Sequence, residues 1–198
     1  MSKEIEYKFK LTDVHCQQLL ASAFCASKAH IQPVITAYYD SPNGSLRQAG
    51  YALRLRELPE GFVQSLKGKG QAEGALHQRE EWDVSIKENR IYPEYIPIPN
   101  LRALVENLLA ASQLNLIFVT DFIRQSWVFD YQQAKIELAI DRGVIKTRNK
   151  AIDIFELEVE LITGEFNDLK YFVSQLLDKI PLVAEPQSKA ERAYCNIP

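Results

Sequence analysis

Hydrophobic and polar residues alternate along much of this chain, which is typical of β-strands whose two faces meet different surroundings. In the first such segment, residues 3–11, Ile5 and Phe9 share one face, whereas Glu4 and Glu6 share the other. The same alternation, or a composition favouring strands, predicts further strands at residues 51–57, 62–69, 77–86, 116–130, 135–141, 144–147 and 152–162, and in a run that ends at Asp40.

Hydrophobic residues with helical spacing predict three helices, at residues 12–29, 101–112 and 166–180. We expect Asn100 to cap the second helix at its N-terminus. Ser188 and Glu191 have the spacing of a capping box and predict a short C-terminal helix. No repeat, low-complexity tract or flexible linker divides the chain, so we expect one domain, residues 1–198, of the α+β class with an antiparallel sheet.

The polar faces of the predicted strands carry charged residues almost throughout, where exposed strands would usually mix in Thr, Ser and Gln. Arg54 and Arg56 share one such face, and Arg79 and Glu81 share another. The helices are numerous enough to cover the apolar faces from outside. If the sheet closes on itself with the helices around it, the charged faces line its interior, and a barrel of about eight strands has room inside for one small ligand.

The expected lining carries nine cations and eight anions, a net charge of +1. The cations are Lys8, Arg54, Arg56, Lys67, Lys69, Arg79, Arg124, Lys189 and Arg192, and the anions are Glu4, Glu6, Glu81, Glu137, Asp141, Glu156, Glu158 and Glu160. So many charges are too costly to bury as core packing. A polyphosphate would satisfy the Lys and Arg residues, and hard divalent cations would satisfy the carboxylates.

The overall composition excludes several classes of protein. The 198 residues include 23 Lys and Arg against 26 Asp and Glu, a net charge of −3, which argues against a nucleic-acid-binding protein. No run of about 18 apolar residues is present, and the first residues lack the apolar core of a signal peptide. Cys16, Cys25 and Cys195 have no metal-ligand spacing, and their odd number favours free thiols. We expect a cytoplasmic protein that binds no membrane.

A series of short motifs on these strands matches a known family in order. The motifs are Glu4-Ile5-Glu6-Tyr7-Lys8, Leu53-Arg54-Leu55-Arg56, Leu66-Lys67-Gly68-Lys69, Gln78-Arg79-Glu80-Glu81, Phe122-Ile123-Arg124, Glu137 with Asp141, Glu156-Leu157-Glu158-Val159-Glu160 and Ser188-Lys189-Ala190-Glu191-Arg192. The first is the E-x-E-x-K signature, and together they cover essentially the whole chain. The chain resembles the CYTH superfamily, also called triphosphate tunnel metalloenzymes.

The resemblance implies an eight-stranded tunnel that binds a triphosphate and divalent metal ions, with two Mg²⁺ or Mn²⁺ ions expected. It implies that the metal ligands lie among Glu4, Glu6, Glu81, Asp141, Glu156 and Glu158. Phosphate binding is expected from Lys8, Arg54, Arg56, Lys67, Lys69, Arg79, Arg124, Lys189 and Arg192. Lys8, Glu137 and Asp141 are the expected catalytic residues, with Asp141 or Glu137 near a second metal ion and its water.

The sequence around the motifs is most similar to that of bacterial inorganic triphosphatases, which hydrolyse tripolyphosphate. Many of these carry an additional helical CHAD domain, which is not expected in a chain ending at Pro198. Class IV adenylyl cyclases carry a His-Phe pair before the first motif, where this chain offers three residues. Thiamine triphosphatases offer an aromatic platform, whereas Trp82 and Trp127 are expected to face outward. A non-catalytic polyphosphate-binding module is a further alternative, disfavoured because all acidic positions are occupied. A homodimer is compatible with the resemblance.

Overall fold

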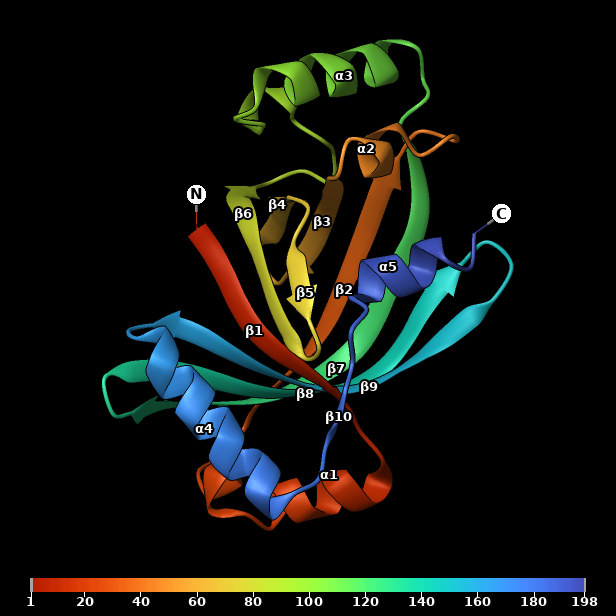
Figure 1. Ribbon diagram of the computed structural model, residues 1–198. Helices are drawn as coiled ribbons and strands as arrows, with labels where there is room; N and C mark the ends of the chain where they lie inside the picture. Colours follow the sequence, from red (N-terminus) through yellow and green to blue (C-terminus); the bar gives the residue numbers. More distant parts are fainter. Residues whose placement is uncertain (1, 198) are drawn as a thin grey trace.

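Antiparallel strand pairing closes the chain into a barrel in this computed structural model, which describes residues 2–197 (Figure 1). The eight strands of the barrel are, in spatial order, β1 (Ser2–Lys10), β9 (Ala151–Thr163), β8 (Ala134–Thr147), β7 (Asn115–Tyr131), β2 (His30–Asp40), β3 (Ala52–Leu58), β4 (Gly61–Lys67) and β6 (Leu76–Ile86). Pairing of β1 with β6, in which Glu4 lies opposite Arg79, closes the ring. The short strands β5 (Gln71–Glu73) and β10 (Val183–Ala184) pair with β6 and β1. The predicted closed eight-stranded barrel is confirmed.

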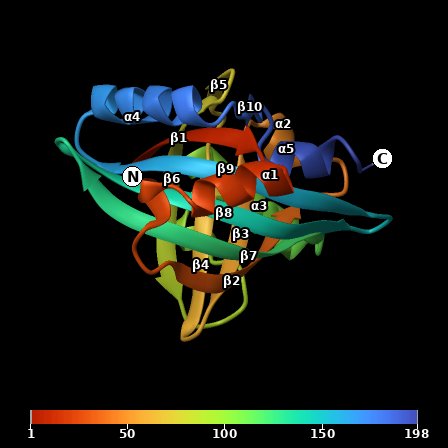
Figure 2. The same cartoon turned by 90° about the horizontal axis from the view of Figure 1, so that it is seen from below.

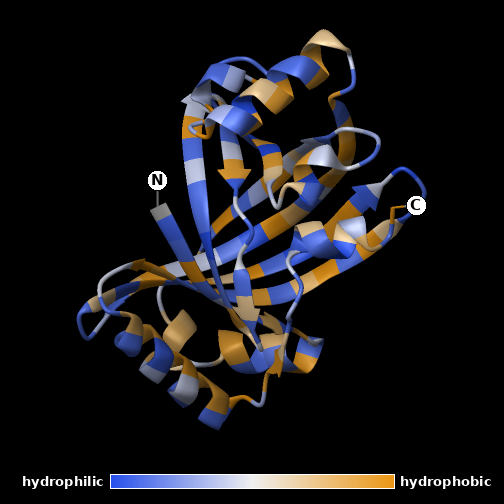
Figure 3. Cartoon of the chain, turned by 45° about the horizontal axis from the view of Figure 1, so that its top comes forward, coloured by the Kyte–Doolittle hydropathy of each residue, from blue (hydrophilic) through white to orange (hydrophobic). Residues whose placement is uncertain are grey.

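Helices cover the outside of this barrel, as the alternating pattern requires (Figures 2 and 3). Helices α1 (Asp13–Leu20) and α4 (Phe166–Lys179) bury one set of apolar faces, in a cluster that includes Leu138 and Phe172. Helix α3 (Pro99–Ala110) covers a second set, which includes Leu53. Trp127 belongs to the first cluster and Trp82 packs against the second, so both face outward as predicted.

One end of the barrel interior is apolar, which differs from the expectation of an interior charged almost throughout. Tyr38 stacks on Phe118 with ring centroids 4.3 Å apart, in a buried cluster that also contains Phe122 and Ala193. Ala193 belongs to α5 (Lys189–Tyr194), and the guanidinium of Arg47 on α2 (Ser45–Gln48) lies over the Tyr194 ring, 4.9 Å from its centroid. The apolar cluster thus seats the C-terminal helix against the barrel.

Three local details differ from the sequence predictions. The helix expected at 12–29 ends at Leu20 and is followed by a 3₁₀ turn at Ala23–Cys25. Helix α3 begins at Pro99, so its N-cap is Ile98 and not Asn100, because proline favours the first helical position. The strands expected at 135–141 and 144–147 form the single strand β8. A side chain at Gly143 would lie 2.3 Å from the carbonyl oxygen of Asp121, so only glycine lets β8 continue beside β7.

The C-terminal helix begins as predicted. The Ser188 side chain accepts a hydrogen bond from the backbone N–H of Glu191, and the Glu191 carboxylate accepts one from the backbone N–H of Ser188. This capping box satisfies donors that the first turn leaves free. It also fixes the start of α5, from which Lys189 enters the barrel.

Candidate active site

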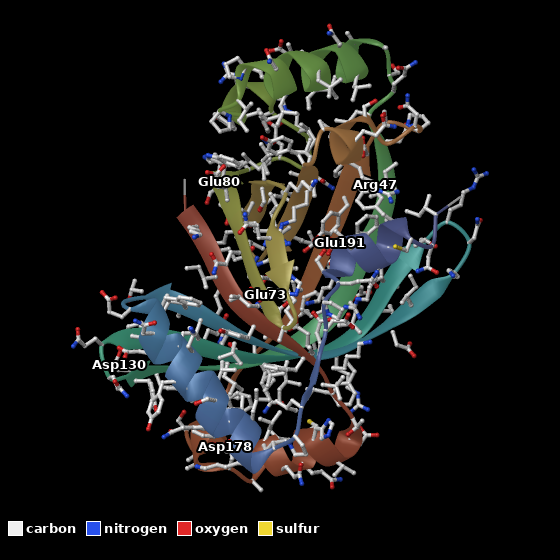
Figure 4. The ribbon with its side chains drawn as sticks, in the orientation of Figure 1. Arg47, Glu73, Glu80, Asp130, Asp178 and Glu191 are labelled. Carbon is white, nitrogen blue, oxygen red and sulfur yellow. The ribbon has the colours of Figure 1, made fainter. Side chains whose placement is uncertain are left out.

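The barrel encloses a cavity of about 720 Å³ whose walls are the inward faces of its strands. Residues of α2 and α5 also line it, among them Arg47 and Glu191, which are labelled in Figure 4. The charged residues of the candidate set that line the cavity are Lys8, Arg54, Arg56, Lys67, Lys69, Arg79, Arg124, Lys189, Glu4, Glu81, Glu158 and Glu160. Those that do not line it are Glu6, Glu137, Asp141, Glu156 and Arg192. Most of the predicted set therefore converges on one cavity.

A first network of ion pairs joins β1 to β4 and β6. Glu4 accepts hydrogen bonds from Arg79 and from Lys67, whose Nζ lies 2.7 Å from its Oε1. Arg79 also reaches Glu6, at 3.0 Å. Burial alone would raise the pKa of Glu4, but the two cations outweigh it and hold that pKa well below its ordinary value. Glu4 is therefore an ionised carboxylate.

Arg54 extends this network to β3. Its Nη2 donates to Glu81 at 2.9 Å, and Lys67 lies 3.2 Å from the other oxygen of the same carboxylate. Burial and the neighbouring Arg54 and Arg79 nevertheless lower the pKa of Lys67. At Lys67, burial together with the neighbouring cations thus outweighs the attraction of Glu4 and Glu81.

A second network fills the space beneath α5. Lys189 Nζ donates to Asp141 at 2.7 Å, to Glu156 at 2.5 Å and to Glu158 at 2.9 Å. Arg124 binds Asp141 with two nitrogens, at 2.8 and 2.7 Å, and also contacts Glu158. Asp141 is completely buried. Lys8 also forms an ion pair with Glu158, and Arg192 forms one with Glu156.

Two groups of carboxylates have oxygens close enough to share a metal ion, each with all ligand atoms within 4.8 Å of one another. One group is Glu4, Glu6 and Glu160, and the other is Asp141, Glu156 and Glu158. Every carboxylate of the second group already binds Lys189, so its contacts do not favour a metal ion there. Glu137 lies 3.8 Å from Arg124, away from the cavity lining. The expected second metal ion near Asp141 or Glu137 therefore finds no support in these contacts.

Glu160 distinguishes the first group. Within residues 2–197 no side chain forms an ion pair or hydrogen bond with its carboxylate, which lines the cavity. Burial, followed by the charges of Glu6 and Glu4, raises the pKa of Glu160 to about 8. A divalent cation would supply the charge this carboxylate lacks and suits three carboxylate oxygens. The residues present therefore fit one Mg²⁺ or Mn²⁺ ion at Glu4, Glu6 and Glu160.

Arg56, on another wall of the cavity, is a cation without a paired anion among residues 2–197. No carboxylate in the described part of the chain pairs with it, and its Nε is buried without a hydrogen-bond partner. Arg54, burial and Arg124 lower the pKa of Arg56. A guanidinium group without a paired carboxylate is suited to bind an anion.

The remaining predicted cations lie at distinct places. Lys69 lines the cavity but is exposed to solvent. Lys8 is buried between Glu6 and Glu158, and these carboxylates raise its pKa although burial opposes the charge. The sequence predicted that a carboxylate of the strand at 156–160 joins Glu4 and Glu6, and Glu156 and Glu158 were the ligands expected from it, whereas the contacts favour Glu160. The period-two spacing with Glu156 and Glu158 was the signal for its position, whereas its lack of a partner depends on the fold.

Together the fold and the cavity define a closed-barrel protein with a charged internal binding site. The family model for the CYTH domain matches residues 2–194, and the chain belongs to this family. An inorganic triphosphatase from Haemophilus influenzae is 34% identical over 157 residues. That match covers 79% of this chain and 44% of the relative, so the chain spans less than half the length of that protein.

Solved structures share the fold at low sequence identity. An adenylyl cyclase candidate from Hippeastrum, described as revealing a dominant triphosphatase activity, superposes with a TM-score of 0.71 and 18% identity, covering 98% of this chain and 96% of that one. The triphosphatase of the Mimivirus capping enzyme superposes with a TM-score of 0.56 and 12% identity, covering 90% of each chain. At these sequence identities, the similarity shows a shared fold alone. None of the helices in residues 2–197 has the length and apolar character needed to cross a bilayer.

Proposed function

We propose that this protein hydrolyses inorganic triphosphate to pyrophosphate and phosphate with Mg²⁺ or Mn²⁺. One observation carries the proposal: the cavity lacks positive charge at Glu160 and lacks negative charge at Arg56. A triphosphate accompanied by a divalent cation meets both deficits at once. The 34% identity to an inorganic triphosphatase over most of this chain supports the same substrate.

Glu4, Glu6 and Glu160 are the proposed ligands of one metal ion. A bound Mg²⁺ would neutralise phosphate oxygens and lower the pKa of a coordinated water. Arg79 and Lys67 hold Glu4 in the ionised form that a metal ligand requires. Their bonds to Glu4 also fix the direction of its carboxylate, as groups behind a metal ligand commonly do.

The basic residues are proposed to bind and orient the phosphate chain. Arg54, Arg56 and Arg124 would face its oxygens and stabilise the charge that develops on the leaving pyrophosphate, the main task of a protein in phosphoryl transfer. Lys8 keeps its proton because its pKa is raised. It is therefore better suited to stabilise negative charge than to accept a proton from water.

A substrate panel tests the proposal. Tripolyphosphate, ATP and thiamine triphosphate would each be incubated with Mg²⁺, Mn²⁺ or EDTA, and phosphate, pyrophosphate and cyclic AMP measured. We expect metal-dependent phosphate release that is fastest with tripolyphosphate. Faster turnover of ATP with formation of cyclic AMP would instead indicate a cyclase, and binding of tripolyphosphate without turnover in either metal would indicate a non-catalytic module.

A further inference from the structure

Two threonine side chains inside the barrel have no hydrogen-bond partner in the described part of the chain. Thr36 of β2 and Thr120 of β7 are each 1% exposed, and both line the cavity. Neither hydroxyl forms a hydrogen bond with any residue between 2 and 197. Both hydroxyl oxygens remain accessible from the cavity, unlike the fully buried Nε of Arg56. The pair therefore offers two free donors to a ligand that accepts hydrogen bonds.

The strand register brings these hydroxyls together with Arg56. Thr36 lies directly opposite Thr120 on one side and directly opposite Arg56 on the other, in three neighbouring strands. All three residues line the cavity, so their side chains share the inward face. They form a continuous patch of hydrogen-bond donors, which we call the Thr36–Thr120–Arg56 patch.

This patch lies across the barrel from the carboxylates. In the order of the eight strands, β2 is four strands from β1 in either direction. Glu4 and Glu6 on β1 and the patch centred on β2 therefore occupy opposite walls. A ligand that contacts both walls must be polar along its whole length and anionic at the patch.

We propose that Thr36 and Thr120 are substrate-binding residues that donate hydrogen bonds to a phosphoryl group of the triphosphate, on the wall opposite the carboxylates. This inference rests on the proposed function and identifies residues outside the charged set that bind the same substrate. A phosphoryl group offers several acceptor oxygens, so it can bind both hydroxyls and the Arg56 guanidinium together. The hydroxyls add donors where a further cation would increase the repulsion that already lowers the pKa of Arg56.

The test replaces each hydroxyl by a methyl group of the same shape, in Thr36→Val and Thr120→Val. Tripolyphosphate binding would be measured by calorimetry in EDTA, so that turnover does not interfere, and melting temperature would be measured without ligand. We expect the dissociation constant to rise about tenfold for each variant, as for loss of a hydrogen bond to a charged group. We expect the melting temperature to stay equal or to rise, because no protein hydrogen bond is lost.

Thr163→Val, which makes the same chemical change at an exposed position of β9, is the matched control and should leave both quantities unchanged. Unchanged tripolyphosphate binding in both inward variants would overturn the inference, as would a melting temperature lowered by several degrees, which would show a structural role. A parent protein that binds tripolyphosphate without hydrolysing it would refute the proposed reaction alone. A parent that does not bind tripolyphosphate at all would refute both.

Discussion

Glu160 and Arg56 are charged residues of the cavity whose charges the rest of the protein leaves uncompensated. Most other charged groups of the lining are bound to a partner of opposite sign, as Glu4 is to Lys67. The raised pKa of Glu160 and the lowered pKa of Arg56 have the same origin, since each side chain is partly removed from water beside groups of its own sign. Ligand binding is the simplest reason for a protein to retain both.

Replacing Glu160 with Gln tests its role as a metal ligand. We expect Glu160→Gln to weaken Mg²⁺ activation of tripolyphosphate hydrolysis by at least about 100-fold, because one of three anionic ligands is lost. Activity would be measured against Mg²⁺ concentration. Glu106→Gln, an exposed change on α3, is the control and should match the parent. An unaltered Mg²⁺ dependence in Glu160→Gln would contradict the assignment.

Replacing Arg56 with Met separates binding from stability. Methionine keeps much of the aliphatic length of the side chain but removes the charge that Arg54 and Arg124 repel. We expect the ligand-free protein to melt about 2–4 °C higher for each kcal/mol of repulsion relieved, while KM for tripolyphosphate rises at least tenfold. Thermal melts and steady-state kinetics check the two effects. A lower melting temperature with unchanged KM would contradict this account.

At the scale of elements, strand β9 shows that residues of one type can have different roles because of their position. Glu156, Glu158 and Glu160 share the inward face of β9, yet Lys189 binds only the first two. The reason is that α5 is placed at the end of β9 nearer Glu156, where its capping box fixes Lys189. Helix α5 therefore turns one part of the strand into a structural ion-pair network and leaves the other part open to a ligand.

Lys189 is accordingly expected to stabilise the fold. Lys189→Met would leave Asp141, Glu156 and Glu158 with too little positive charge in a buried place, at a cost of roughly 3–5 kcal/mol. Urea unfolding of the metal-free protein would measure this loss. Lys28→Met, an exposed change, should alter the unfolding free energy by less than about 0.5 kcal/mol. Equal stability of the two variants would refute the structural role.

The same network predicts how stability changes with pH. Burial alone would raise the pKa of Glu158, but Lys189, Lys8 and Arg124 hold it well below its ordinary value. A carboxylate with a lowered pKa in the folded state stabilises the protein above its unfolded pKa of about 4.5, and this contribution is lost as pH falls further. Unfolding free energies measured from pH 7 to pH 3 should therefore fall more steeply for the parent than for Glu158→Gln. Parallel curves would contradict the prediction.

At the scale of the whole molecule, alternation along the strands predicted most of the cavity lining, and the resemblance to the CYTH superfamily predicted that the sheet closes into a barrel. Alternation along each strand identified the inward faces, and the amphipathic helices accounted for the outward ones. The pairing of charges could not be predicted, because it depends on which strands are neighbours and on the stagger between them. Thus Glu156 pairs with Lys189 and Arg192, whereas no side chain within residues 2–197 pairs with Glu160 on the same face of the strand. The inward position of Phe118 and Phe122 was not predicted, because the same face of β7 also carries the charged Arg124.

The most direct test of the central claim is the stoichiometry of tripolyphosphate turnover, followed by ³¹P nuclear magnetic resonance with Mg²⁺ or Mn²⁺. Among the described residues, Glu160 lacks a paired cation and Arg56 lacks a paired anion, which a metal ion and a triphosphate would supply. We therefore predict that each tripolyphosphate yields one pyrophosphate and one phosphate, and that EDTA abolishes the reaction. Full occupancy of the cavity by tripolyphosphate with no phosphate released in either metal would contradict the claim.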